Sequence, residues 1–466
     1  MEVIVKGQQT RPEMFPHIIS CPNEMVALFM EDGFTRYSGK PQAVIVHVDV
    51  GTQGLEAAVH NASIGRAPVL IFAGISLLTM EGEMRGSRTE NVHWMQYIPD
   101  QKLILCQYCR HTTELKTEGE SPVVLATLPD GAAKQVITVL KTTIESLVIT
   151  GYSELANLML PLNVLDNGGS DMCFPADHSP WLGMRFAIED RIEKADATLV
   201  LHCDVPWIPT QCKPSKTTTV VHIDVDTLNP TMPKFYLPAI ARWNAGSVTA
   251  VIQVIKTLRE DEERGSLRGI HGVPKIRTCG PAGDIRNLVP ADTIFAIEAV
   301  TNTHYVEDTI QIVLPGSWVS CGGAGLSWSG GTALFIKLVS ELTSGTGMCK
   351  FVVQIVEDGT FIFSVPGAVY WISQHYKIPI LTILLNNNDQ SIASCPPKPI
   401  ISKIDGRMEC SAKVDVVCLS DGLGSKATNE ELNISFTHIT DYGGTAKASN
   451  SGALFTKKVD DVGKLE

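Results

Sequence analysis

The sequence predicts an α/β protein built on parallel β-sheets, and three observations lead to this prediction. Continuous apolar runs of about four to eight residues recur along the chain, as in strands that are buried on both faces of a parallel sheet. Longer segments of helical pattern separate these runs, which is typical of strand–helix–strand units. At 466 residues the chain is long enough for two or three such units.

Composition and charge narrow the class of protein. A hydrophobic content of 44% with 19% charged residues is ordinary for a well-buried α/β enzyme, and the sequence has no uninterrupted apolar stretch of about 18 residues that would predict a membrane span. The net charge of −12 argues against nonspecific binding of nucleic acid. The 12 scattered cysteines are typical of reduced thiols. We therefore expect a cytoplasmic or organelle-interior protein that acts on small molecules.

Near the amino terminus, Cys21-Pro22-Asn23-Glu24 precedes a helical pattern that continues through Asp32-Gly33-Phe34. Glu24 is predicted to lie in the first turn of this helix, where an acidic side chain interacts favourably with the helix dipole. Taken alone, this structural role is sufficient to explain Glu24.

The next block predicts a strand, a glycine-bearing turn, a helix and a second strand. Residues 43–50 form the first apolar run, residues 51–62 the turn and helix, and residues 68–74 the second run. His47, Asp49 and Gly51 are expected on one face of the first strand, at the edge of a polar site. A histidine hydrogen-bonded inside a strand is an equal alternative for His47.

The middle of the chain contains further strand-like runs at residues 147–149, 198–201 and 220–223. Asp224-Val225-Asp226 is interpreted as a turn after the last of these strands. Cys106 and Cys109 with His111 resemble part of a zinc site, but a second pair of ligands at finger-like spacing does not follow. We therefore predict no metal at that position.

Two hydrophobic runs in the last third end in polar residues. Residues 351–356 lead to Glu357-Asp358-Gly359, and residues 380–385 lead to Asn386-Asn387, with one helix expected between them. Because parallel strands end at the same edge of a sheet, Asp358 and Asn387 are expected to meet there. Mg²⁺ suits such a pair, since it takes one or two protein oxygens and lets substrate phosphates complete its octahedron.

This segment resembles the signature of the thiamine diphosphate (ThDP)-dependent enzymes, which is Gly-Asp-Gly, some two dozen residues, and Asn-Asn. The resemblance implies that Asp358 and Asn387 bind Mg²⁺ together with a main-chain carbonyl near Asp389, and that Gly359 and Thr360 contact the cofactor. Glu357 departs from the pattern, because it replaces the first glycine. A carboxylate there repels a diphosphate unless it points away or is paired.

The same resemblance extends to the other blocks. It implies that Glu24 is the glutamate that promotes the imino tautomer of the cofactor's aminopyrimidine by general acid–base action, and that His47 transfers protons at a bound 2-oxo acid. Gly51 and Thr52 would contact the cofactor. In the glycine-rich segment 322–331, Gly323 would approach the cofactor closely and Leu326 would support its bent form.

The implied fold has three Rossmann-like three-layer α/β/α domains with parallel sheets. These are a pyrimidine-binding domain at residues 1–115, a central domain at 120–262 and a diphosphate-binding domain at 285–466, with residues 259–269 as a linker. Some family members bind FAD in the central domain, but this sequence gives no support for it. The resemblance also implies a strand–helix element ahead of Met1, so we expect a truncated amino terminus.

Two functions follow as hypotheses. The first is a ThDP- and Mg²⁺-dependent enzyme that acts on 2-oxo acids by acetolactate synthase-like carboligation or by non-oxidative decarboxylation, as in benzoylformate decarboxylase. The family's sites form between subunits, so a homodimer or homotetramer is expected. The alternative is a non-catalytic relative that keeps the fold and assembly but has lost cofactor turnover. Glu357 and the expected truncation favour the alternative.

Overall fold

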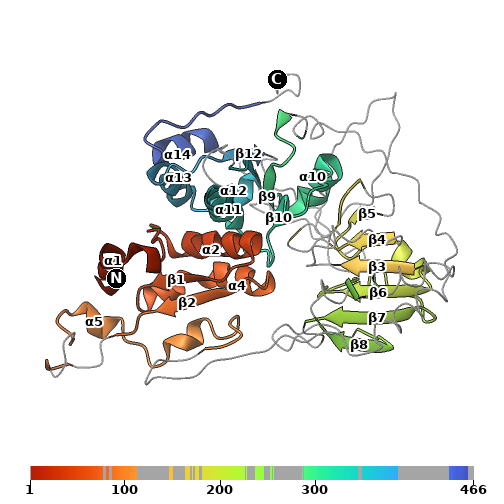
Figure 1. The fold of residues 1–466 in the computed structure, drawn as a ribbon, viewed down its shortest axis with the longest axis horizontal. Coiled ribbons are helices and arrows are strands. Elements are labelled where there is room, and N and C mark those ends of the chain that lie inside the picture. The colour runs from red at the N-terminus through yellow and green to blue at the C-terminus, as the bar shows by residue number, and fades with distance from the viewer. Residues whose placement is uncertain are drawn as a thin grey trace, which may run out of the picture.

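Figure 1 shows the computed structural model of the chain. It describes residues 2–76, 80–82, 87–112, 146–150, 163–167, 171, 174–177, 181–225, 227, 237–245, 252–253, 256, 286, 288–344, 349–386 and 440–459. The expected linker at 259–269 and the expected junction of the first two domains near 118–133 lie outside these residues. The described strands form three parallel sheets of two, four and six strands, so the predicted α/β class with parallel sheets is confirmed.

The first sheet pairs β1 with β2 in parallel. The unit that contains it, red to orange in Figure 1, has these elements in chain order: α1 (Glu2–Thr10), a 3₁₀ turn (Pro12–Met14), α2 (Glu24–Ser38), β1 (Gln42–Val46), α3 (Val50–Gln53), α4 (Glu56–Ile64), β2 (Val69–Ala73), α5 (Val92–Met95) and a 3₁₀ turn (Gln101–Ile104).

The six-stranded sheet has the order β5-β4-β3-β6-β7-β8, and all its pairs are parallel. From β3, the strand order proceeds through β4 and β5 to one edge of the sheet and through β6, β7 and β8 to the other. This is the arrangement of a doubly wound sheet. Its elements are β3 (Ser146–Thr150), β4 (Asn163–Asp166), β5 (Trp181–Met184), α7 (Arg191–Lys194), β6 (Ala197–Leu201), β7 (Thr219–Asp224) and β8 (Ala241–Asn244).

The four-stranded sheet has the order β10-β9-β11-β12. Its strands β9 and β11 are buried along their whole length, as expected when helices cover both faces of a parallel sheet. The elements of this unit are β9 (Ile294–Glu298), a 3₁₀ turn (Val300–Asn302), α10 (Thr303–Ile310), β10 (Trp318–Ser320), α11 (Trp328–Ser344), β11 (Val352–Glu357), α12 (Asp358–Phe363), α13 (Pro366–His375), β12 (Leu381–Leu385) and α14 (Tyr442–Ser449).

One expectation about this unit is wrong. A single helix was predicted between β11 and β12, whereas two helices, α12 and α13, lie there. Pro366 begins α13, and Val365 before it has φ 39°, in the left-handed region. Proline removes a backbone donor and disfavours helical geometry in the preceding residue, so the chain breaks at this point.

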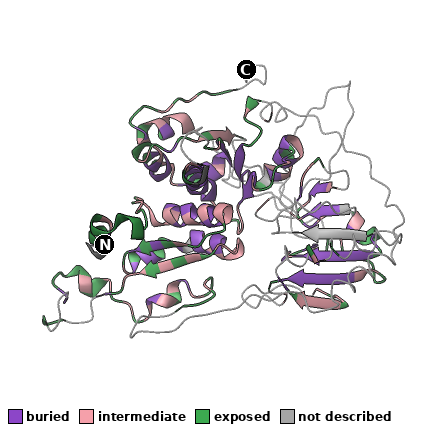
Figure 2. Cartoon of the chain, in the orientation of Figure 1, coloured by how far each residue is buried: buried purple, intermediate pink, exposed green. Residues whose placement is uncertain are grey.

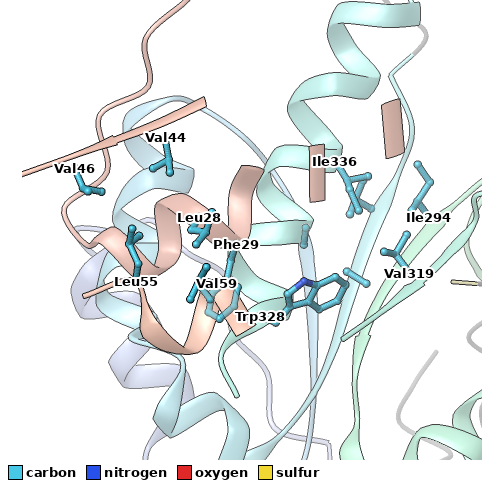
Figure 3. Close-up of a cluster of buried hydrophobic side chains, with 14 of the residues drawn as sticks. Leu28, Phe29, Val44, Val46, Leu55, Val59, Ile294, Val319, Trp328 and Ile336 are labelled. Atoms are coloured by element: carbon cyan, nitrogen blue, oxygen red, sulfur yellow. The ribbon is translucent and has the colours of Figure 1, made fainter. Parts of the chain in front are cut away.

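Helix α11 lies between the first unit and the four-stranded sheet, with α2 on one side and β9 and β11 on the other. Close packing of α2 on α11 depends on glycine: a Cβ at Gly33 would lie 2.8 Å from the Thr332 Cα, and one at Gly331 would lie 2.9 Å from the Val26 oxygen. Figure 3 shows the hydrophobic core that results, with Trp328 beside Phe29 and Val59. The two units therefore share one core.

Burial differs sharply between the sheets (Figure 2). In β1, Val44 and Val46 face the core while Ile45 is 50% exposed. Leu70 and Phe72 of β2 are 64% and 50% exposed, so one face of this two-stranded sheet is open and apolar. Among the described helices, none is both long enough and apolar enough to cross a membrane.

Candidate functional site

Helix α2 presents Glu24 at its first turn. The Asn23 side chain caps the helix, because its Oδ1 accepts a hydrogen bond from the Val26 N–H at 3.1 Å. The half-buried Glu24 carboxylate lies beside the turn that follows β1: a Cβ at Gly54 would come within 3.2 Å of Oε2, and one at Gly51 within 3.6 Å of Oε1. Glycine at both positions therefore keeps the surroundings of the carboxylate open.

His47 lies at the same turn, although its strand is shorter than expected. β1 ends at Val46, and the backbone reverses at Asp49, which has φ 49°. The prediction that His47, Asp49 and Gly51 share one strand face is therefore wrong. His47 and Glu24 nevertheless meet at Gly51, because a Cβ there would also lie 3.0 Å from the His47 Cβ. His47 is exposed, so its imidazole is open to a ligand.

Gln101 holds this turn in place and was not predicted. Its Nε2 donates to Thr52 Oγ1 at 2.9 Å and to the Gly74 oxygen at 2.7 Å, while its Oε1 accepts from the Asp49 N–H at 3.1 Å. Gln101 thus joins the turns that follow β1 and β2. The Thr52 hydroxyl is buried, and its hydrogen bond with Gln101 therefore lies inside the turn. A lone polar residue whose partners lie 27 to 52 positions away leaves no periodic signal in a sequence.

Asp358 begins α12 directly after β11 and is buried. Its Oδ1 accepts a hydrogen bond from the Gly359 N–H at 2.9 Å, and Thr360 is buried in the same turn. The expected pairing of the two strands is confirmed, since β11 and β12 are parallel neighbours with Glu357 in register with Leu385. Asn387 and Asp389, the other predicted metal ligands, lie outside the described residues.

The residues present fit a magnesium ion better than a transition metal. Within the described residues there is no group of three or more His, Cys, Asp or Glu side chains that could hold a metal. Mg²⁺ needs fewer protein ligands, because waters and phosphates supply the rest. A single buried carboxylate at the carboxyl edge of a parallel sheet matches that requirement, so Asp358 fits the implied ion.

Glu357 is paired with a residue of the neighbouring turn. Its Oε1 accepts hydrogen bonds from Asn302 Nδ2 at 2.6 Å and from the Asn302 N–H at 3.2 Å. Asn302 ends the short turn between β9 and α10. The carboxylate that replaces the family's glycine therefore stabilises the neighbouring turn, and these hydrogen bonds hold it toward Asn302.

Tyr442 is a second residue near Asp358 that was not predicted. Burial and then the Asp358 carboxylate raise the pKa of Tyr442. The Tyr442 ring packs edge-on against Phe361 of α12, with ring centroids 5.7 Å apart. Its position more than 80 residues after Asp358 gave no sequence signal.

In the glycine-rich segment, an acid of the same chain occupies the start of the helix that follows. Two backbone N–H groups at the start of α11, those of Trp328 and Ser329, donate to the buried Glu298 carboxylate at 3.1 and 2.8 Å. Burial raises the pKa of Glu298 to about 7, against the opposing effect of these hydrogen bonds. This helix start therefore already holds an acid of the same chain. Gly323 faces His60 and Asn61 of α4, and Leu326 is half-buried beside it.

The two halves of the predicted site lie in different layers of one chain. Glu24 and His47 belong to the β1–β2 unit, and Asp358 belongs to the edge of the four-stranded sheet. Helices α2 and α11 lie between these sheets (Figure 1). Because packed helix axes are about 8–10 Å apart, the two sheets are well separated.

A cavity of about 380 Å³ lies elsewhere, where the three units meet. Arg36, Tyr37, Asp171 and Trp318 are among its lining residues. Glu24 begins α2 and Arg36 is near its end, so the cavity lies roughly 18 Å along the helix from Glu24. It is therefore separate from the candidate site.

Sequence comparison identifies the first unit. Residues 8–104 match the sequence model of a protein family described as "Thiamine pyrophosphate enzyme, N-terminal TPP binding domain". This segment contains Glu24, His47, Gly51 and Thr52. The resemblance to the thiamine diphosphate-dependent enzymes is therefore confirmed. No curated protein matches the chain by sequence.

Solved structures share the fold over most of the chain. A protein from Mycobacterium smegmatis, described as a thiamin diphosphate-dependent enzyme, is 18% identical, with a TM-score of 0.65 over 82% of this chain and 83% of its own. The thiamine diphosphate-dependent 4-hydroxybenzoylformate decarboxylase of Rhodococcus jostii RHA1 is 17% identical, with a TM-score of 0.57 over 79% of each chain. Benzoylformate decarboxylase from Polynucleobacter necessarius is 16% identical, with a TM-score of 0.60 over 82% of this chain and 81% of its own.

Proposed function

We propose that the chain is a ThDP- and Mg²⁺-dependent enzyme that acts on 2-oxo acids, by non-oxidative decarboxylation or acetolactate synthase-like carboligation. The observation that carries this proposal is the meeting of Glu24 and His47 at Gly51, inside the segment that matches the thiamine pyrophosphate enzyme domain. A carboxylate beside an exposed imidazole supplies two groups that can exchange protons at one place.

The proposal assigns a role to each unit. Residues 1–115 are the pyrimidine-binding domain, 120–262 the central domain and 285–466 the diphosphate-binding domain. Each is expected to be a three-layer Rossmann-like unit. The order of the six-stranded sheet supports this reading for the central domain.

When bound, ThDP would supply nucleophilic-carbon chemistry toward the carbonyl group of a 2-oxo acid. The Glu24 carboxylate exchanges a proton with the pyrimidine ring nitrogen, and Gly51 and Gly54 leave the room that this contact needs. The His47 imidazole, exposed at the turn, holds or delivers a proton at the substrate's carbonyl oxygen. Gln101 keeps the turn that carries both groups in a fixed position.

Asp358 would hold the Mg²⁺ ion together with Asn387 and a carbonyl near Asp389. Gly359 brings no side chain toward the diphosphate, and the Glu357 carboxylate is held by hydrogen bonds from Asn302. Thr360, Leu326 and Gly323 complete the proposed cofactor contacts.

Decarboxylation is the branch to test first. Two of the solved structures that share the fold are named benzoylformate decarboxylases, and the place of His47 favours an aryl 2-oxo acid. Carboligation shares the same cofactor residues, so both products belong in one assay.

The proposed assembly is a homodimer or homotetramer. Glu24 begins α2, and α11 lies between α2 and the four-stranded sheet whose edge carries Asp358. A complete site would therefore take Glu24 from one subunit and Asp358 from its partner. The open apolar face of β1 and β2 offers a surface for further association.

A non-catalytic relative is the second candidate, and one observation favours it. Glu298 already occupies the N–H groups at the start of α11, which a bound anion could otherwise use. This candidate predicts a folded protein that does not bind ThDP.

Titration calorimetry with ThDP separates the two candidates. The enzyme requires saturable binding that depends on Mg²⁺ and is abolished by EDTA. A folded sample without binding would identify the non-catalytic relative.

The role of Glu24 is tested by Glu24→Gln. We expect ThDP binding to be retained, while exchange of the cofactor's C2 proton, followed by NMR, slows by roughly 10²-fold or more, because the variant lacks the general acid–base group. Glu13→Gln, at an exposed glutamate of the same unit, is the control. Equal exchange rates in both variants would rule out this role for Glu24.

A further inference from the structure

The glycine-rich loop of residues 321–327 needs support from outside itself. It joins β10 to α11, and two of its residues other than glycine have positive φ angles, Ala324 at 55° and Ser327 at 96°. Such backbone conformations are costly for residues with a Cβ and persist only where neighbouring groups enforce them. The loop therefore depends on contacts from the rest of the chain.

Asn61 of α4 supplies those contacts from the first unit. Its Oδ1 accepts hydrogen bonds from the Gly323 N–H at 3.1 Å and the Gly325 N–H at 2.9 Å, and its Nδ2 donates to the Gly325 oxygen at 2.6 Å. The Cys321 thiol also lies 3.4 Å from Oδ1. Asn61 is fully buried, so these bonds form without competition from water.

The chemistry of this arrangement favours asparagine over its near relatives. One face of the loop presents two N–H donors and one carbonyl acceptor, and a side-chain amide matches both kinds of group. An aspartate would set a carboxylate oxygen against the Gly325 carbonyl. A leucine would leave the three buried backbone groups without partners, at a substantial cost in free energy.

The glycines of the loop follow from the same contact. A Cβ at Gly323 would lie 2.8 Å from Asn61 Oδ1, and one at Gly325 would lie 2.8 Å from the Ala57 oxygen. Both distances are too short for any side chain. These glycines therefore let the loop backbone lie directly on α4.

We propose that Asn61 is a positioning residue, which fixes the glycine-rich loop and thereby Leu326 for binding of the cofactor. This inference rests on the proposed function, because Leu326 is placed at the cofactor by that proposal. Asn61 itself touches only protein. It acts through the loop, and it makes the affinity for ThDP depend on how the first unit is docked.

Cys321 reports on the position of the loop without any cofactor. Burial, followed by the nearby Glu298 carboxylate, raises the pKa of its thiol to about 12. The thiol is therefore poorly reactive while the loop lies on α4. Release of the loop would expose the thiol to water and to alkylating reagents.

The test compares Asn61→Ala with Ser63→Ala, a control on the same helix. In the cofactor-free protein, the rate at which N-ethylmaleimide modifies Cys321 is measured by peptide mass spectrometry, with the exposed Cys349 as an internal standard. We expect about a tenfold faster reaction of Cys321 in Asn61→Ala only, and a ThDP dissociation constant raised by about tenfold or more, on the scale of the lost buried hydrogen bonds.

Unchanged modification of Cys321 in Asn61→Ala would overturn the proposal, and so would unchanged affinity for ThDP. If the Asn61→Ala variant does not fold, the wild-type protein provides the test. Saturating ThDP with Mg²⁺ is then expected to slow the modification of Cys321 severalfold. Equal rates with and without the cofactor would refute the link between the position of the loop and cofactor binding. A wild-type protein without ThDP binding would refute the proposed function itself, whereas the cofactor-free comparison would still show whether Asn61 holds the loop.

Discussion

At the scale of single residues, the direction of a side chain decides what its charge does. Glu357 stands where the family signature has glycine, and its identity alone predicts repulsion of a diphosphate. The structure directs its carboxylate to Asn302, with hydrogen bonds of 2.6 and 3.2 Å. The acid therefore stabilises the turn between β9 and α10.

This contact reverses the expected effect of removing the acid. Glu357→Gly is expected to leave ThDP affinity unchanged or weaker, and to lower the free energy of unfolding by roughly 1–3 kcal/mol, because the Asn302 donors lose a buried acceptor. Glu357→Gln keeps an acceptor oxygen and is expected to behave nearly as the wild type. Calorimetry with ThDP and urea denaturation measure the two quantities. Tighter ThDP binding by the glycine variant would show that the carboxylate faces the diphosphate.

The sequence predicted some residues of the candidate site and not others. Asp358 was predictable, because it follows a buried apolar run and parallel strands end at a common edge. Glu24 and His47 were predictable only through the resemblance. Asn61 and Gln101 were not, since each contacts backbone groups far away in the sequence, and neither periodicity nor local spacing encodes such contacts.

At the scale of elements, β11 and β12 were predicted within one or two residues, whereas β9, which is buried along its whole length, was not predicted. The end of β1 and the break between α12 and α13 were not predicted either. Both occur at residues with positive φ other than glycine, Asp49 and Val365. Such conformations are imposed by surrounding contacts, for example that of Gln101 with Asp49, and are not an intrinsic preference of these residue types.

Helix α10 joins the six-stranded sheet to the turn that contains Asn302. Glu307 on this helix is buried, and its Oε2 accepts a hydrogen bond from the Met184 N–H of β5 at 3.0 Å. The buried Asp166 carboxylate at the end of β4 is a close neighbour, and Arg185 pairs with Asp308 at 3.1 Å. Burial, then Asp166, raises the pKa of Glu307 well above its usual range.

The raised pKa of Glu307 predicts how stability depends on pH. The folded state favours the protonated acid, so this contribution to stability is complete below the unfolded pKa of about 4.3 and is lost as pH rises toward the raised value. Glu307→Gln keeps an acceptor for the Met184 N–H and does not ionise. We expect it to match the wild type near pH 4 and to be more stable by about 1 kcal/mol or more at pH 8, in urea denaturation.

Glu193→Gln, at an exposed glutamate of α7, is the matched control for this prediction. Its pH dependence should follow that of the wild type. A Glu307→Gln variant whose stability falls with pH as steeply as that of the wild type would show that another buried acid, such as Glu298, sets the dependence.

At the scale of the whole molecule, the order of layers determines what one chain can do. The four-stranded sheet, α11, α2 and the β1–β2 sheet follow one another, and the core around Trp328 fixes this order. Helix α11 thereby lies between α2, which begins at Glu24, and the sheet whose edge carries Asp358. We therefore expect an enzyme that uses both residues at one cofactor to build its site between two chains.

Complementation between two inactive variants tests this arrangement. Glu24→Gln and Asp358→Ala chains are each expected to be inactive in C2-proton exchange of ThDP, and so are their separate homodimers. After unfolding and refolding together in equal amounts, about half of the dimers are mixed, and one of the two sites in each mixed dimer has both native residues. We therefore expect about a quarter of the wild-type exchange rate. If each site were built within one chain, every site in the mixture would lack one residue, and the mixture would stay as inactive as its components.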